Sequence, residues 1–270
     1  MLNDLQNRIT VAKVGDYKFI RHRYMHRLLF GLLLFAIWQG AVNLELYPRY
    51  LLPSPGDILQ TMIYGFIEAD YGLAILESLR RVIFGYLLAI SVGLFAGLAI
   101  ARYHFLDTTV GASLTALQSI PSVAWVPLAL LWFGISEAAV LFIVILEAFI
   151  PCALGVRSGV MNIPREIIRA GQTLGAKHLD LYIRVILPAI VPQLITSLKL
   201  SWAFAWRALI AGELFVSGLG IGQSLELGRS LADMAQVISM IVIIAILGFV
   251  SDNLLFTKLE KSLREKWGLN

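Results

Sequence analysis

The stretch VIFGYLLAISVGLFAGLAI, residues 82–100, decides the fold. It carries no charged side chain, and its length matches the roughly 20 apolar residues that a helix needs to cross a bilayer. Apolar and polar residues do not alternate along it, which argues against a strand of a membrane barrel. Because only helices and closed barrels satisfy their backbone hydrogen bonds in lipid, the stretch predicts a transmembrane helix.

Five more apolar stretches predict transmembrane helices, so we expect an all-α, polytopic membrane protein with six spans. These five cover residues 28–44, 110–133, 138–156, 189–211 and 232–256. The composition agrees, because 58% of the 270 residues are hydrophobic and 15% are charged, whereas about 25% of the residues of a typical soluble domain are charged. This apolar content also argues against a nucleic-acid-binding protein, although the net charge is +4.

Lysine and arginine gather in three segments, residues 1–27, 157–188 and 257–270. Six spans would place all three on one side of the membrane, which the positive-inside rule identifies as the cytoplasm. We therefore expect a multi-pass protein of a bacterial-type inner (plasma) membrane with both termini cytoplasmic. The first segment lacks the features of a removable signal peptide. Arg80 and Arg81 fall at the outer end of the second span, where we expect them to snorkel to the interface or to attract an anion.

The spans and loops divide the chain into five predicted regions. These are a cytoplasmic tail (1–27), the first transmembrane helix with its outer loop (28–50), an outer amphipathic helix on the membrane surface (51–71), a core domain (72–256) with a cytoplasmic loop at 157–188, and a cytoplasmic tail (257–270). In the second span, small residues at every fourth position let another helix approach closely, within the subunit rather than across a dimer. They are Gly85, Ala89, Gly93, Gly97 and Ala101.

Two prolines, Pro121 and Pro127, interrupt the third predicted span. Proline has no N–H and breaks the hydrogen-bond ladder of a helix, which leaves carbonyl groups in need of partners. In a membrane such a helix is expected to face other parts of the protein or a water-filled path rather than lipid. Gln118 and Ser119 directly precede the first break, and their polar side chains favour a path.

The loop MNIPREIIRAGQTLGAKHLDLYIRVILPAIVP, residues 161–192, predicts two short helices. Pro164 suits the first turn of the first helix, where its missing N–H costs nothing. Gly175 suits the end of that helix, in a left-handed conformation, and Pro188 is expected to mark the turn into the fifth span. Two helices joined at a glycine make a rigid projection, so we expect a docking surface for a soluble partner.

This loop resembles the EAA loop of binding-protein-dependent ABC importer permeases, whose pattern is Glu-Ala-Ala, three residues, Gly, nine residues, then Ile-x-Leu-Pro. The chain keeps this spacing with Arg169, Ala170, Gly171, Gly175, Val185, Leu187 and Pro188. Arg169 stands where the family has Glu, and Glu166, one turn earlier, is placed to substitute for it electrostatically. The segments LPSPGDIL, SLRRVIFGYLLA, IPSVAWVPLALLWFG and AGELFVSGLGIG resemble the nitrate, sulfonate and taurine branch of this family.

The resemblance implies the type I ABC importer permease fold and a homodimer of six-helix subunits. It also implies two cytoplasmic ATP-binding subunits that contact the loop, and a soluble or lipid-anchored substrate-binding protein. Because the chain has no G-x-x-x-x-G-K-[ST] phosphate loop, ATP and Mg²⁺ are expected on the partner subunits and no cofactor on this chain. The implied cargo is a small oxyanion of the sulfonate, nitrate, bicarbonate or taurine type. A vitamin or pyrimidine precursor is the alternative.

Polar residues inside the spans indicate a translocation path, because ionisable groups in a membrane are usually functional or paired. The candidates are Gln118, Ser119, Pro121, Trp125, Glu147, Trp206, Arg207 and Glu213. Glu147 either pairs with Arg207 and ties the fourth span to the fifth, or both face the path and favour a zwitterion. Otherwise Arg207, together with Gln118, binds the head group of an anion. Glu213 precedes a glycine-rich outer loop, where a structural role at a hinge is also expected.

Two other classes of protein remain as alternatives, an intramembrane enzyme and a non-transporting membrane scaffold. An enzyme needs converging catalytic or metal-binding side chains, but all four histidines fall in tails and loops and Cys152 is the single cysteine. We therefore expect no catalytic and no metal-binding residue. A scaffold would use the loop at 161–192 for docking, but without an ATPase.

Overall fold

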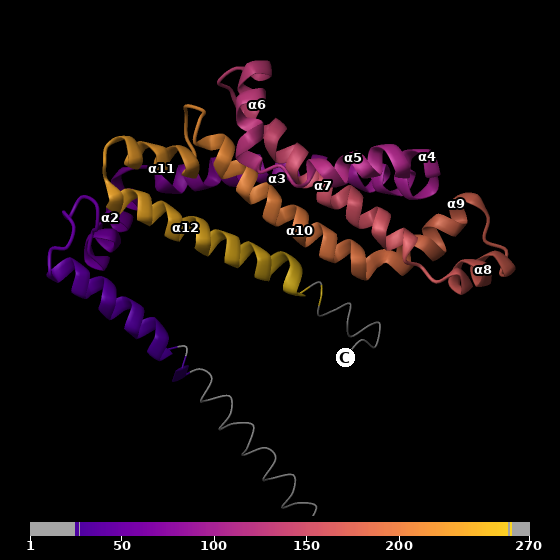
Figure 1. Cartoon of the computed structure of the whole chain (residues 1–270), viewed down its shortest axis with the longest axis horizontal. Helices are drawn as coiled ribbons and strands as arrows, with labels where there is room; N and C mark the ends of the chain where they lie inside the picture. The colour runs from indigo at the N-terminus through magenta and orange to yellow at the C-terminus, as the bar shows by residue number, and fades with distance from the viewer. Residues whose placement is uncertain (1–24, 27, 259, 261–270) are drawn as a thin grey trace, which may run out of the picture.

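The computed structural model describes residues 25–26, 28–258 and 260. In this part of the chain every regular element is a helix, which confirms the all-α class. Three long helices pack side by side and contain most of the core (Figure 1). They are α3 (Tyr71–Arg102), α7 (Glu137–Met161) and α10 (Leu187–Glu213).

Four of the six predicted spans are confirmed as helices that are long and apolar enough to cross a membrane. They are Tyr71–Arg102, Glu137–Met161, Leu179–Glu213 and Met234–Phe256. The first begins well before residue 82, because ion pairs of Glu77, Arg80 and Arg81 offset the charges in its early turns. The apolar helix Leu28–Asn43 occupies the first predicted span and is shorter than these four, so the count of six spans stays a prediction.

The third predicted span is a bent pair of helical segments. The first segment consists of α4 (His104–Leu106), η1 (Asp107–Gly111) and α5 (Ala112–Leu117), and the second of η2 (Ser122–Trp125) and α6 (Val126–Phe133). The chain bends by 103° between the two segments. The bend lies around Pro121, whose backbone is extended, with a ψ of 141°. The expectation that Pro127 also breaks the helix is wrong, since it lies in the first turn of α6, where an N–H has no helical partner.

The small residues of α3 face α7, as predicted. A Cβ atom added at Gly85 would lie 2.7 Å from Cγ1 of Val144, and one at Gly97 would lie 2.5 Å from the carbonyl oxygen of Ala153. Both distances are shorter than real contacts, so these positions need glycine for the two helices to approach so closely. This packing lies within one subunit, and it buries Cys152 completely.

α12 (Met234–Asp252), continued by η4 (Asn253–Thr257), lies beside α10 (Figure 1). The indole N–H of Trp202 on α10 donates a hydrogen bond of 3.0 Å to the hydroxyl of Ser251 on α12. The contact between these helices is otherwise sparse, which leaves room between them.

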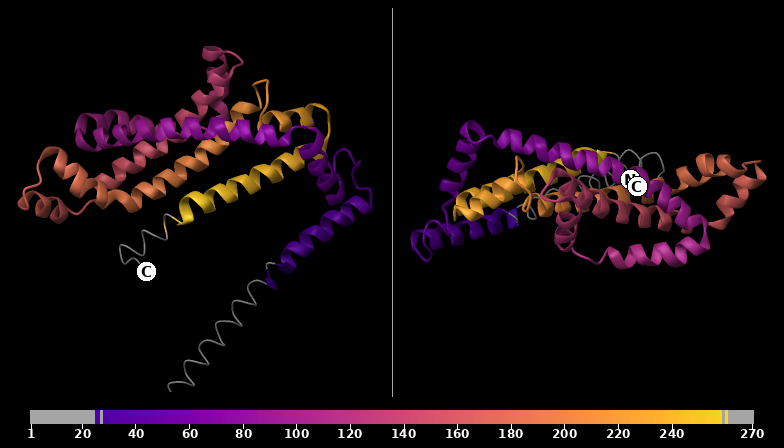
Figure 2. Two further views of the ribbon diagram at one scale, coloured as in Figure 1. Left: turned by 180° about the vertical axis from the view of Figure 1, so that it is seen from behind. Right: turned by 90° about the horizontal axis from the view of Figure 1, so that it is seen from above.

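Shorter helices cover the two ends of the bundle (Figures 1 and 2). One end carries α8 (Arg165–Thr173) and α9 (His178–Leu181), and the other carries α2 (Pro55–Glu68) and α11 (Ile221–Ser230). α2 is the predicted outer helix. Ser54 and Asp57 cap its start reciprocally, and the hydrogen bonds from Ser54 hold the pKa of the Asp57 carboxyl below its ordinary value. The predicted tails, 1–27 and 257–270, lie almost wholly outside the described residues.

α9 continues through η3 (Tyr182–Ile186) into α10 with no intervening loop. The prediction of a turn at Pro188 is therefore wrong, because this proline lies in the first turn of α10. Proline cannot donate to the carbonyl four residues back, and the chain adopts the wider π-helical pattern just before it. The result is one helix of 35 residues, Leu179–Glu213.

Candidate functional site

A cavity of about 620 Å³ lies between α10, α12 and η2. Its walls are mainly apolar and aromatic. They are formed by Val123, Trp202, Ala203, Trp206, Arg207, Ile210, Ala211, Leu214, Ile244, Gly248 and Asp252. The cavity thus joins two of the predicted path residues, Trp206 and Arg207, to the break in the third predicted span.

Two tryptophans form a rigid wall of this cavity. The rings of Trp202 and Trp206 meet edge to face with their centroids 6.0 Å apart, and Tyr86 packs against Trp202 at 5.0 Å. Trp202 is 4% exposed and Trp206 is 7% exposed, so packing fixes both rings. The indole N–H of Trp206 has no hydrogen-bond partner among the described residues, which leaves one donor unused.

Arg207 brings a positive charge to the cavity. Its guanidinium carbon lies 5.2 Å from the centroid of the Phe204 ring, within the range of a cation–π interaction. Glu147 on α7 is buried, and its electrostatic neighbours are Trp125 and Arg207. No direct ion pair joins Glu147 to Arg207, although both are described. The first alternative for these two charges, a direct pair, therefore does not occur.

Asp252 supplies a negative charge to the cavity, and the sequence analysis missed it. Its carboxylate forms an ion pair of 3.0 Å with Lys199 on α10. The pair balances these two charges and leaves Arg207 as the lining cation without a direct counter-ion among the described residues. Asp252 is one of two charged residues in the predicted span 232–256, and this is the signal by which it could have been found.

Three predicted path residues frame the break without lining the cavity. Gln118 and Ser119 follow α5, and Pro121 precedes η2. The hydroxyl of Ser119 donates a hydrogen bond of 2.6 Å to the carbonyl of Ala116, which satisfies part of the helix end. None of the three belongs to the cavity walls, so the expected partnership of Gln118 with Arg207 is not seen. In the described part of the chain, no cluster of His, Cys, Asp or Glu side chains could hold a metal ion.

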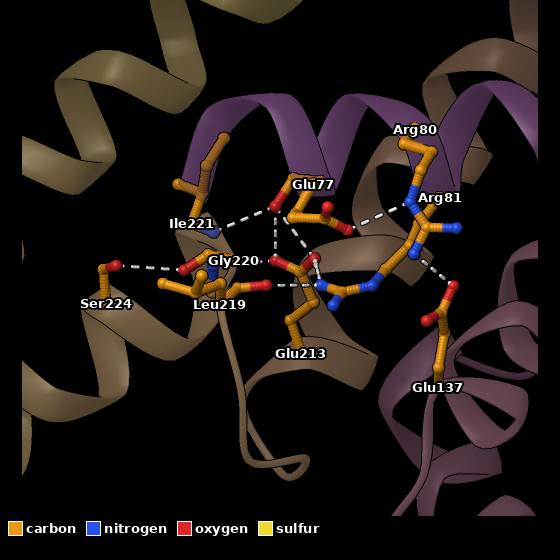
Figure 3. A network of polar contacts seen from close by, with 11 residues as sticks. Glu77, Arg80, Arg81, Glu137, Glu213, Leu219, Gly220, Ile221 and Ser224 are labelled. Carbon is orange, nitrogen blue, oxygen red and sulfur yellow. Dashed lines mark hydrogen bonds and ion pairs between the residues drawn. The ribbon is translucent and has the colours of Figure 1, made fainter. Parts of the chain in front are cut away.

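Glu213, the last predicted path residue, belongs to a buried polar network at the α11 end of the bundle (Figure 3). Its carboxylate accepts hydrogen bonds from Arg81 at 2.7 Å, from the Ser78 hydroxyl at 2.8 Å and from the N–H of Gly222 at 2.9 Å. Arg81 also donates to the carbonyl of Leu219 at 2.8 Å. Glu213 is fully buried and Arg81 is 8% exposed. The prediction that Arg81 snorkels or attracts an anion is therefore wrong. The contacts of Glu213 connect the end of α10 to α3 and to the start of α11.

Arg80, next in sequence to Arg81, points to solvent, whereas Arg81 is buried. It is exposed and pairs with Glu77 at 3.0 Å and with Glu137 at 2.7 Å (Figure 3). Adjacent residues of a helix project about 100° apart, so only the packing of the whole bundle decides which of the two arginines is buried.

The predicted docking loop has the helix stop expected at Gly175. This glycine has a φ of +92°. The N–H of Ala176 donates to the carbonyl of Gly171 at 3.0 Å, and the N–H of Gly175 donates to the carbonyl of Gln172 at 3.0 Å, which is the Schellman pattern of a helix end. α8 and α9 are thus joined by a defined turn.

Gly171 stands where the EAA pattern has its second alanine, and its surroundings explain the difference. A Cβ atom added at Gly171 would lie 2.7 Å from Cγ2 of Val185, so α8 approaches η3 too closely for alanine. Together with the turn at Gly175 and with α9, these two segments line a cavity of about 320 Å³. Leu174, one of its lining residues, is 89% exposed. Glu166 and Arg169 are both exposed and form no ion pair with each other. The loop therefore presents an apolar tip flanked by charged side chains.

Comparison with known proteins identifies a family. The profile of the binding-protein-dependent transport system inner membrane component matches residues 89–265. A chain of Methanocaldococcus jannaschii named as an ABC transporter permease is 37% identical over 79% of this chain and 76% of that one. A nitrate import permease of Leptolyngbya laminosa is 30% identical over 88% and 86% of the two chains. An aliphatic sulfonates transport permease of Bacillus subtilis is 28% identical over 92% and 89%.

The fold is shared with a solved transporter, described as the crystal structure of an amino acid ABC transporter with histidines. The likeness has a TM-score of 0.56 at 17% identity and covers 77% of this chain and 98% of that one. At this identity it bears on the fold alone, and it agrees with the predicted type I fold. The family match covers more than half of the sequence. The chain is therefore an inner membrane component of a binding-protein-dependent transport system, a multi-pass ABC importer permease and not an enzyme.

Proposed function

We propose that two copies of this chain form the translocation path of an importer for a small oxyanion, with the cavity beside Arg207 as its passage site. One observation carries the proposal: Arg207 lines a largely apolar cavity next to a broken membrane helix and has no direct counter-ion among the described residues. Ionisable groups so placed usually serve transport. The names of the nitrate and sulfonate permeases among the relatives support the same class of cargo.

The chemistry of the cavity suits a site that must bind and then release an anion. The planar guanidinium of Arg207 can donate two parallel hydrogen bonds to an oxyanion. Apolar walls exclude water and strengthen this attraction. The buried carboxylate of Glu147 weakens it again, since it acts on the same guanidinium. Weak, reversible binding is what a path requires, because the cargo must also leave.

The partners follow from the family and from the loop at 157–188. Two cytoplasmic subunits that carry ATP and Mg²⁺ dock on α8, the turn at Gly175 and α9, where Leu174 is exposed. A soluble or lipid-anchored binding protein delivers the cargo at the opposite end of the bundle. The distribution of lysine and arginine supports cytoplasmic termini.

The test of the passage site is Arg207→Gln, assayed as uptake by the importer assembled with its ATPase and binding protein. Loss of one charge-assisted contact predicts that uptake falls about tenfold or more at low substrate concentration, while assembly and ATPase activity stay normal. The double variant Lys199→Gln with Asp252→Asn is the control, because it removes the ion pair beside the cavity without changing the net charge there. Unchanged uptake by Arg207→Gln would sink the proposal. If the importer takes up an uncharged heterocycle equally well with Arg207→Gln and with the wild type, the cargo is a vitamin or pyrimidine precursor instead.

Docking is tested separately with Gly175→Ala. A left-handed alanine costs roughly 1–2 kcal/mol, so the turn between α8 and α9 should deform and the ATPase should no longer copurify. Gly72→Ala is the control, since a Cβ atom there meets nothing within 4 Å. A wild-type complex that contains no ATPase would favour a membrane scaffold.

A further inference from the structure

We infer that the cavity beside Arg207 takes an organic anion with an aromatic ring, in preference to an inorganic oxyanion. The inference rests on the proposed function and names the cargo of the same site. Its anionic group would lie at Arg207, and its ring would lie against Trp202 and Trp206, next to the gap at Gly248.

The size of the cavity favours an organic cargo. Pockets of about 300–1,000 Å³ hold organic ligands that bury most of their surface, and this cavity measures about 620 Å³. A nitrate ion would fill a small part of this space. It would reach Arg207 but would leave most of the apolar wall without contact, so it would gain no binding energy from burial of apolar surface.

The walls favour an aromatic body with one charged end. Trp202 and Trp206 already meet edge to face, the arrangement that aromatic rings prefer with one another, and both are fixed by packing. Trp206 and Arg207 both line the cavity, and the indole N–H of Trp206 has no hydrogen-bond partner among the described residues. Asp252 is balanced by Lys199. The cavity therefore offers one site for an anionic group and an apolar aromatic surface for the rest of the cargo.

Gly248 keeps part of this cavity open. It lines the cavity, and a Cβ atom added there would meet nothing within 4 Å. Glycine inside a helix costs about 0.5–1 kcal/mol relative to alanine, so the missing side chain has a cost that packing does not explain. Because a side chain at this position would start in open space beside the cavity, we expect a leucine to occupy part of the cavity. It would reduce the room for a ring while leaving Arg207 accessible to a small anion.

The experiment is binding of radiolabelled benzenesulfonate to the full-length permease in lipid nanodiscs, with methanesulfonate and nitrate as competitors. We expect saturable binding that unlabelled benzenesulfonate displaces at concentrations at least tenfold lower than either small anion. Gly248→Leu should weaken benzenesulfonate binding about tenfold or more, the scale of a pocket that loses apolar contact. Gly72→Leu, at an equally open glycine outside the cavity, should leave binding unchanged.

Three results would overturn the inference: no saturable binding of benzenesulfonate, displacement by nitrate or methanesulfonate at equal concentration, or normal binding by Gly248→Leu. Uptake assays with the assembled importer distinguish an error in the inferred cargo from an error in the proposed passage site. Suppose that ATP-driven uptake of nitrate or methanesulfonate is lost with Arg207→Gln but unchanged with Gly248→Leu. The proposed function would then stand, and the inference of an aromatic cargo would be wrong. If Arg207→Gln leaves uptake unchanged, the proposed function itself is wrong.

Discussion

Two arginine–glutamate arrangements lie within the same helical bundle and differ in how far the protein satisfies them. Arg81 and Glu213 are in direct contact at 2.7 Å and are buried together. Arg207 is exposed to the cavity, and Glu147 acts on it only at longer range. The difference teaches that a charge fully satisfied by its own protein holds helices together. A charge left without a direct partner is available to a cargo.

Removal of Glu213 should have the largest effect on stability. Glu213→Ala leaves the Arg81 guanidinium buried and uncompensated, which costs about 3–5 kcal/mol in the free energy of unfolding. Denaturant titration of the purified permease measures the loss. The double variant Arg81→Met with Glu213→Leu removes both charges and should recover most of it. If Glu213→Ala unfolds like the wild type, the network does not hold the α11 end together.

An added methyl group at Gly220 should break the same network less severely. A Cβ atom there would lie 2.7 Å from the carboxyl carbon of Glu213. The φ of Gly220 is 173°, an extended value that any residue adopts, so only the clash with Glu213 matters. Overpacking of this kind costs about 1–3 kcal/mol, measured by the same titration. Gly72→Ala should show no such loss, and an equal loss in both variants would mean that the clash is not the cause.

Lys199→Met should affect stability weakly. The side chains of Lys199 and Asp252 are 40% and 38% exposed, and solvent screens exposed pairs, so the loss should stay below about 1 kcal/mol. The freed carboxylate of Asp252 should also repel an anion from the cavity and lower uptake. A cost as large as that of Glu213→Ala would place this pair with the structural network.

Arg207→Gln should have the smallest effect on stability, within about 0.5 kcal/mol, as for surface substitutions. Uptake should fall in the same variant, which would separate transport from folding. The measurement is denaturant titration beside the uptake assay. A large loss of stability here would erase the contrast between the two arrangements.

Local patterns predict the helices of this protein better than its long-range contacts. The glycine stripe of α3 and the stop at Gly175 depend on spacing and on one backbone conformation, so sequence suffices for both. The contact between Arg81 and Glu213 joins residues 132 positions apart, and nothing in either segment specifies the partner. The break at Pro121 is predictable, but the angle of 103° depends on how both segments pack.

The cavity shows the same limit. Trp206 and Arg207 stand out in an apolar span and are found from sequence. Asp252 lies at the end of α12, where a charge is usual at the boundary of a span. Gly248 carries no side chain and hence no chemical signal of its own. Only the packing of α12 against α10 shows that both residues line a cavity.

The unbroken run from α9 through η3 into α10 makes the fifth span a lever. The docking loop lies near one end of the helix Leu179–Glu213, and Arg207 lies near the other. At 1.5 Å per residue, roughly 40 Å of helix separate Leu181 from Arg207. Over this length, a tilt of about 5° displaces Arg207 by roughly 3 Å, about the width of a water molecule. A small rotation at the proposed ATPase contact would thus move Arg207 by a distance comparable to a hydrogen bond.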